Sequence, residues 1–228
     1  MEENTFRIKK SYIYAALGVL LVFGFFMYSL VLKDNNYPVR TQVTGMVNEN
    51  SMNQNSNSMA DHHKPVQSNS NGFFENAIGK TAPEFELQDI EGTTFKLSDY
   101  KGKNVVLFFN EGSMCYPACW NQIAELSKDG RLNSDDTVAF SIVVDSSAQW
   151  QKIIQKAPQM SKSKILFDTA KKTVSDYDVL FTASSMHKGS YPGHTYFIID
   201  KEGIIRYTKD DPSMAIRNNE LAAELAKL

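Results

Sequence analysis

The run NVVLFFN, residues 104–110, constrains the fold more than any other stretch of this 228-residue chain. It combines β-branched and aromatic residues without a charge, which is typical of a strand buried on both faces. The run TVAFSIVVD (137–145) has the same character, and KILFD (164–168) is a third, shorter strand. Strands of this kind need a covering layer on each side, so we expect them at the centre of a domain.

Amphipathic segments alternate with these strands. In ACWNQIAELSK (118–128), Ile123 and Leu126 share one helical face, and Ser147 can cap the helix AQWQKIIQKA. The remaining expected elements are two short strands around a turn at Glu91-Gly92, a helical run at 170–180, a hairpin formed by 195–200 and 204–208, and a last helix at 218–228. This order predicts an α/β fold, with a mixed sheet flanked by helices on both faces.

The stretch from Tyr12 to Leu32 carries no charge. As a helix it is about 32 Å long, enough to cross a bilayer core, and it exceeds the usual apolar core of a cleaved signal peptide. Arg7, Lys9 and Lys10 precede it, which favours a cytoplasmic N-terminus at 1–11. We therefore expect a single-pass signal-anchor at 12–32 in the cell membrane, with the C-terminal domain outside the cytoplasm, where thiols are oxidised.

Residues 33–72 are rich in Asn, Ser and Gln and poor in large apolar residues, so we expect a disordered linker. Residues 73–228 then form one domain. The formal net charge is −2, and no basic patch is interleaved with aromatic residues, which argues against a nucleic-acid partner.

Cys115 and Cys119 are the two cysteines of the chain, and they follow the strand at 104–110 directly. If the next helix begins near Pro117, Cys119 lies in its first turn, where the positive end of the helix dipole favours a thiolate. Their spacing allows an internal disulfide or a shared metal ion. A purely structural clip is the third alternative, although so short a closed loop gains little chain entropy.

Three motifs resemble the thioredoxin-like superfamily in its redoxin branch, the peroxiredoxins of the alkyl-hydroperoxide-reductase/thiol-specific-antioxidant type: GKTAPEFELQDIEGTTFKLSDYKGKNVVLFF, ILFDTAKKTVSDYDVL and HTYFIIDKEGIIRY. The resemblance implies a thioredoxin fold and a redox-active centre of antioxidant function, without a cofactor. Cys119 with Gln122 occupies the peroxidatic position, and Cys115 would resolve it. Tyr116 stands where the family has threonine, and His194 stands where it has arginine, whose field on a thiolate is stronger than that of a neutral imidazole.

Two other branches share part of the pattern. Thioredoxin-type reductases exchange disulfides through two cysteines one residue closer together, so a protein disulfide is an alternative substrate. Sco-type copper chaperones carry the same cysteine spacing and a distant histidine, which implies copper held by Cys115, Cys119 and His194.

These observations lead to one functional hypothesis. We expect a membrane-anchored, extracytoplasmic thiol-dependent oxidoreductase that reduces peroxides or protein disulfides, with Cys119, Cys115, Tyr116 and His194 at the site and a thiol protein as reductant. A copper-binding chaperone is the alternative. His187, Lys188 and the acidic pair Asp210-Asp211 are interpreted as solvated loop and turn residues.

Overall fold

The computed structural model describes residues 70–228. The expected cytoplasmic segment 1–11, the anchor 12–32 and the linker up to residue 69 lie outside the described residues. Within residues 70–228, no helix has both the length and the apolar character needed to cross a membrane.

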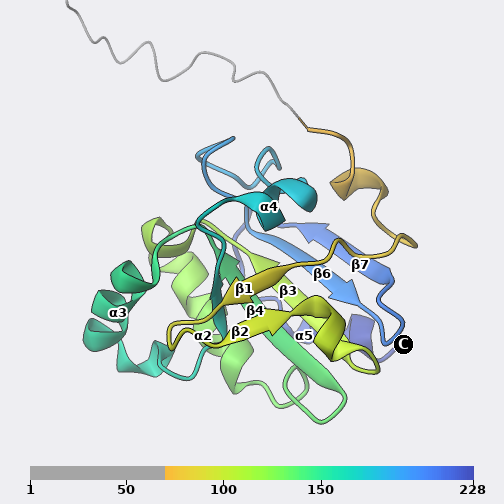
Figure 1. Cartoon of the computed structure of the whole chain (residues 1–228), viewed down its shortest axis with the longest axis horizontal. Helices are drawn as coiled ribbons and strands as arrows, with labels where there is room; N and C mark the ends of the chain where they lie inside the picture. The colour runs from red at the N-terminus through yellow and green to blue at the C-terminus, as the bar shows by residue number, and fades with distance from the viewer. Residues whose placement is uncertain (1–69) are drawn as a thin grey trace, which may run out of the picture. The chain divides into compact units, whose positions relative to one another are not determined.

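A seven-stranded mixed sheet forms the centre of the domain, in the order β2-β1-β5-β4-β3-β6-β7 (Figure 1). β3 runs parallel to β4, and β4 runs parallel to β5, whereas the pairs β3–β6, β6–β7, β1–β5 and β1–β2 are antiparallel. The strands are β1 (Glu86–Gln88), β2 (Thr94–Lys96), β3 (Asn104–Phe109), β4 (Thr137–Val143), β5 (Ile165–Phe167), β6 (Thr195–Ile199) and β7 (Ile205–Asp210).

Helices cover both faces of this sheet, as the strand composition requires. α2 (Ala118–Lys128), α3 (Ser147–Lys156) and α5 (Asn218–Leu225) pack with alternate residues of the central strands, such as Val106 and Phe108. α4 (Lys172–Asp176) and the chain around it pack on the opposite set, which includes Val105 and Leu107. Short 3-10 turns lie at Phe74–Asn76, Leu97–Tyr100, Gly112–Met114 (η5) and Pro158–Met160.

The expected strands and helices are confirmed, with boundaries shifted by a few residues. One local expectation is wrong: Ser147 is the first residue of α3, and Ser146 is its cap, because the Ser146 side chain accepts a hydrogen bond from the backbone N–H of Gln149. The backbone of Ser146 is extended, as a capping residue requires.

The loop after β3 is held by a buried carboxylate from the end of β4. Asp145 accepts hydrogen bonds from the backbone N–H of Ser113 at 2.8 Å, from the Ser113 hydroxyl at 2.8 Å and from the indole of Trp150 at 2.9 Å. Gly112 lies directly against it, with φ at 62°, and a Cβ atom at that position would be 1.9 Å from Asp145 Oδ2. This contact fixes the start of the segment that carries both cysteines.

We expect Gly112→Ala to lower the free energy of unfolding by about 3 kcal/mol, because it combines a left-handed backbone with a displaced carboxylate. Gly102→Ala is the matched control: its φ is 86°, but nothing lies within 4 Å of the added Cβ, so about 1 kcal/mol is expected. Urea unfolding of the two variants measures the difference. Equal losses would show that the Asp145 contact does not hold the loop.

Candidate active site

The two cysteines form a disulfide at the beginning of α2. Cys115 follows η5 and Cys119 is the second residue of α2, with a Cα–Cα distance of 5.3 Å. Pro117 immediately precedes the helix, which confirms that Cys119 lies in the first turn. Both side chains are buried, with 4% of Cys115 and 1% of Cys119 exposed. In this oxidised state the side chain of Cys119 is therefore enclosed.

His194 lies beside the disulfide because β3 and β6 are neighbours. Phe109 at the end of β3 pairs with Thr195 at the start of β6, so the residue before β6 meets the loop that follows β3. The Nδ1 atom of His194 is 3.6 Å from Sγ of Cys119. The two cysteines and His194 are thus brought together, as expected from the sequence.

Tyr196 extends this arrangement into the core. Its hydroxyl is 2.8 Å from Nε2 of His194, and its ring stacks on Phe108 at 4.8 Å between centroids. Phe108 also contacts the imidazole edge-on at 4.5 Å. Burial lowers the pKa of His194 from 6.5 to about 4, against the opposing effect of the Asp211 carboxylate, and burial raises the pKa of Tyr196 far above its usual value. Both groups are therefore neutral at pH 7.

Sequence reasoning assigned Tyr196 to a strand and gave it no part in the site. The sequence could have indicated its place, because side chains two positions apart in a strand point to the same face. A tyrosine at 196 therefore lies on the same side of β6 as the residue at 194.

The loop between β7 and α5 supplies a further neighbour. The sulfur of Met214 is 3.9 Å from Sγ of Cys115. Asp211 is 3% exposed and binds the guanidinium of Arg217 with both carboxylate oxygens at 2.7 Å. The interpretation of Asp211 as a solvated turn residue is wrong, because Asp211 is buried and its carboxylate holds this loop together by hydrogen bonds.

The neighbouring Asp210 accepts hydrogen bonds from the backbone N–H groups of Ala183 and Ser184.

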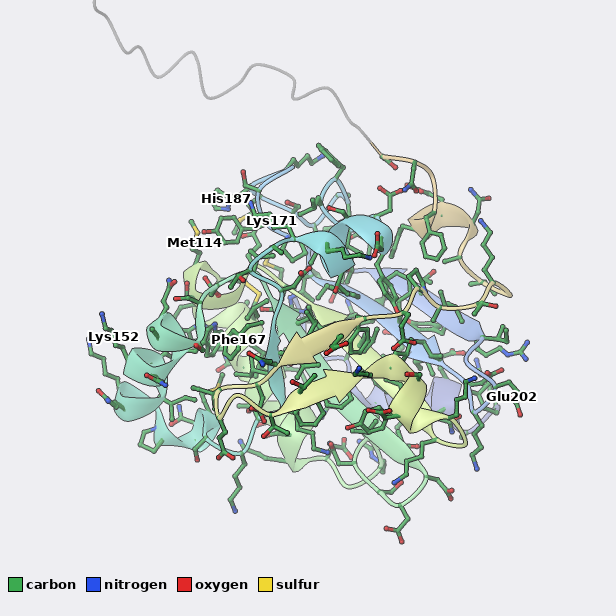
Figure 2. The ribbon with its side chains drawn as sticks, viewed as in Figure 1. Met114, Lys152, Phe167, Lys171, His187 and Glu202 are labelled. Carbon is green, nitrogen blue, oxygen red and sulfur yellow. A yellow bond between two sulfur atoms is a disulfide. The ribbon has the colours of Figure 1, made fainter. Side chains whose placement is uncertain are left out.

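A second buried carboxylate ties another loop to the cysteine segment. Glu111, 1% exposed, accepts hydrogen bonds from the backbone N–H groups of Met186 and His187, and it pairs with the His187 ring at 3.3 Å. Figure 2 shows Met114 and His187 at the same end of the domain. The side chain of His187 is 43% exposed, which agrees with the sequence interpretation of a solvated loop residue. The sequence did not indicate that Glu111 holds this residue.

The other two expected site residues point elsewhere. Tyr116 is 71% exposed, and its ring contacts Trp120 edge-on at 5.0 Å. The amide of Gln122 is buried between α2 and the start of α5: its oxygen accepts from the backbone of Arg217 at 2.7 Å, and its nitrogen donates to Asn218 at 2.9 Å. Gln122 thus holds the β7–α5 loop against α2.

The site combines two kinds of chemistry. A dithiol at the start of a helix, next to a neutral imidazole, is suited to nucleophilic attack by a thiolate. The same atoms are soft ligands: among the described residues, the ligand atoms of Cys115, Cys119 and His194 lie within 4.8 Å of one another.

Comparisons with known proteins agree with the fold and the cysteine chemistry. The AhpC/TSA family matches residues 78–208. Peroxiredoxin Bcp of Bacillus subtilis is 33% identical over 129 residues, which are 55% of this chain and 80% of that protein. Thiol-disulfide oxidoreductase ResA of Geobacillus thermodenitrificans is 51% identical over 41 residues, which are 18% of this chain and 23% of that protein.

Among solved structures, AhpC of Enterococcus faecalis aligns with 66% of this chain and 91% of its own, with a TM-score of 0.57 and 21% identity. This likeness shows the fold, a thioredoxin-like mixed sheet with flanking helices. The family match spans more than half of the chain and includes both cysteines and His194. The chain belongs to the AhpC/TSA family, and it is a peroxiredoxin-type thiol-dependent peroxidase.

Proposed function

We propose that Cys119 is the nucleophile of this peroxidase, that Cys115 resolves the oxidised form, and that His194 supports the thiolate. The observation that carries the proposal is the position of the Cys119 sulfur, in the first turn of α2, bonded to Cys115 and 3.6 Å from His194 Nδ1. A helix start favours the thiolate, and a second sulfur within bonding distance completes a two-cysteine cycle.

In the reaction, the Cys119 thiolate attacks the terminal oxygen of a hydroperoxide. The O–O bond breaks, the alkoxide leaves as an alcohol after taking a proton, and Cys119 becomes a sulfenic acid. The Cys115 thiolate then attacks that sulfur and displaces hydroxide, which leaves as water, and the disulfide forms. A dithiol protein supplies two electrons and two protons to restore the two thiols.

His194 would act as a neutral hydrogen-bond donor. With a thiolate as acceptor, Nδ1 carries the proton, and Nε2 then accepts a hydrogen bond from the Tyr196 hydroxyl, 2.8 Å away. Tyr196 is a positioning residue, since its hydroxyl holds the imidazole in place at Nε2. If His194 stands in for the family arginine, as the resemblance implies, the positive charge of a guanidinium is replaced by the N–H dipole of a buried imidazole.

A protein disulfide is the second candidate substrate. The two residues that flank Cys115 are apolar and exposed, Met114 by 49% and Tyr116 by 71%, and a protein surface could dock on them. The local similarity to ResA supports the same reaction, in which Cys119 or Cys115 attacks a substrate sulfur. Peroxide remains the preferred substrate because the family match covers the domain and the ResA match covers 41 residues.

We further propose that the domain acts on the extracytoplasmic side of the cell membrane. The uncharged stretch 12–32 and the basic residues Arg7, Lys9 and Lys10 before it support this location.

The first prediction from the proposed function concerns the two sulfurs. Cys119→Ser should reduce peroxide consumption to the uncatalysed rate, because no thiolate remains at the helix start. Cys115→Ser should consume about one equivalent of peroxide and stop at a sulfenic acid, which dimedone traps as an adduct visible by mass spectrometry. Turnover of Cys119→Ser at the unchanged rate, or a dimedone adduct on Cys115 in the wild-type chain, would contradict the assigned roles.

The second prediction concerns the protonation of His194. Because its pKa is about 4 in the folded protein and near 6.5 when unfolded, the unfolded chain binds more protons between these values, and stability falls as the pH is lowered from 6.5 to 4. The disulfide-bonded chain should lose about 3 kcal/mol more across this window than His194→Gln does. Urea unfolding at a series of pH values gives the two curves, and parallel curves would exclude a buried neutral imidazole.

The third prediction concerns location. In bacterial cells the full chain should sediment with membranes, and deletion of residues 12–32 should release it. Protease added to intact spheroplasts should digest the domain. Protection from protease until the cells are lysed would place the domain on the cytoplasmic side.

A further inference from the structure

We propose that exposed apolar side chains around the disulfide form a docking surface for a protein dithiol, the reductant that returns this chain to its thiol state. The inference rests on the proposed function, since it concerns the reductive half of the same cycle. The side chains are Met114, Tyr116, Met186 and Ile216, which together form the apolar rim. Among the described residues, they are four of the six large apolar side chains that remain exposed.

Two segments bring most of the rim to Cys115. Met114 and Tyr116 are its direct neighbours in the chain. Ile216 lies in the β7–α5 loop, two residues after Met214, whose Sδ is 3.9 Å from Sγ of Cys115. The half-buried thioether of Met214 therefore joins the exposed part of this loop to the buried sulfur.

A third segment adds Met186. Its backbone N–H donates to the Glu111 carboxylate at 2.6 Å, and the backbone N–H of His187 donates to the same oxygen at 3.0 Å. Glu111 directly precedes η5, which ends at Met114. Figure 2 shows Met114 and His187 at the same end of the domain. The buried glutamate thus holds Met186 beside the cysteine segment.

The three segments present no charge of their own. Residues 112–117, 183–186 and 212–216 contain no Asp, Glu, Lys or Arg, although charged residues make up 22% of the chain. The acids that precede two of these segments, Glu111 and Asp211, are buried. A partner that docks here gains by removing apolar area from water, and a charged partner would lose hydration without meeting an opposite charge. The rim therefore fits an uncharged, apolar surface.

The disulfide at the centre of the rim defines what the partner carries. Cys115 and Cys119 are buried, and the cycle needs two electrons that a thiol delivers to a disulfide by direct attack on sulfur. A protein that covers the rim can present its own cysteine at this point. A protein disulfide substrate would meet the reduced chain, whereas the rim is observed around the disulfide form, which a reductant attacks.

The exchange balances as two displacements at sulfur. The partner thiolate attacks Sγ of Cys115, the bond to Cys119 breaks, and Cys119 leaves as a thiolate that the start of α2 and His194 stabilise. A second partner thiolate then attacks the partner sulfur of the mixed disulfide, and Cys115 leaves as a thiolate. The partner becomes a disulfide, and its two protons remain with the two thiols of this chain.

The test compares two dithiol peptides on the full chain in its disulfide form. Each peptide has blocked ends and two cysteines separated by two residues, flanked by leucines in one peptide and by asparagines in the other. Alkylation and mass spectrometry count the thiols released in this chain, at equal concentrations of peptide thiolate. We expect the leucine peptide to reduce the disulfide about tenfold faster. Equal rates for the two peptides would overturn the inference.

Ile216→Ser is the decisive variant, because it places a hydroxyl in the rim and leaves both cysteines and His194 unchanged. It should remove most of the preference for the leucine peptide. Urea unfolding verifies that the variant is folded. A tenfold preference that persists in folded Ile216→Ser would refute the rim as the docking surface.

Ile78→Ser is the matched control. The side chain of Ile78 is 63% exposed and that of Ile216 is 54% exposed. The backbone N–H of Gly79 binds the carbonyl of Ile205, at the beginning of β7, so Ile78 lies at the other end of this strand from the β7–α5 loop. Ile78→Ser should keep the wild-type preference, and an equal loss in both variants would contradict a local docking surface.

Two other occupants of the rim give different results, and either would overturn the inference. If the rim joins two copies of this chain, the wild type sediments as a dimer and Ile216→Ser as a monomer, with equal rates for the two peptides. If the rim receives a disulfide substrate, Ile216→Ser slows only the attack of the reduced chain on the oxidised leucine peptide.

Single-turnover oxidation of the reduced chains by hydrogen peroxide separates this inference from the proposed function. Ile216→Ser should react with peroxide at the wild-type rate, since a small peroxide does not need the rim. Rim-dependent peptide rates in a chain that consumes no peroxide would contradict the peroxidase cycle and support the docking surface. An active peroxidase without peptide preference would overturn this inference alone.

Discussion

The antiparallel pairing of β3 with β6 is the contact on which the site depends. It sets the end of one central strand against the start of another, so the cysteine segment and His194 meet although they are separated by 75 positions in the chain. The same register places Phe108 opposite Tyr196, and their stacked rings form the apolar floor beneath the imidazole. A shift of one residue would turn His194 and Tyr196 to the other face of the sheet and separate them from the sulfurs.

Around this pairing, two buried carboxylates organise the loops that enclose the disulfide. Glu111 holds the loop that contains His187, and Asp211 holds the turn that presents Met214. A third carboxylate, Asp145, fixes the loop that leads to Cys115. Each accepts several hydrogen bonds from groups that would otherwise be unsatisfied, so each loop keeps one conformation despite its lack of regular structure.

The chain keeps the fold of its family around a centre without a formal charge on His194. The imidazole is neutral, and a tyrosine hydroxyl, able to donate or accept, lies behind it. Tyr116 lies on the surface against Trp120. The resemblance of motifs implies arginine and threonine at the positions of His194 and Tyr116 in other members, so we expect the centre of this chain to be less charged than theirs.

The sequence by itself determined the central strands and the helix that begins after Pro117, because these depend on local periodicity. It also determined that the two cysteines are close enough to form a disulfide, because their spacing is short. The similarity of motifs to the family identified His194 as a site residue. Only the tertiary structure decided that Tyr196, Met214 and the Asp211–Arg217 pair lie around the sulfurs. The positions of Met214 and of the Asp211–Arg217 pair follow from loop packing, a long-range contact that neighbouring residues do not reveal. For Tyr196 the sequence indicated only that it shares a face of the strand with residue 194, and strand order and register then placed that face against the sulfurs. From the sequence, Met214 in a polar loop and Asp211 in an acidic pair look like surface residues. In the folded domain Asp211 is buried and Met214 is partly buried beside Cys115.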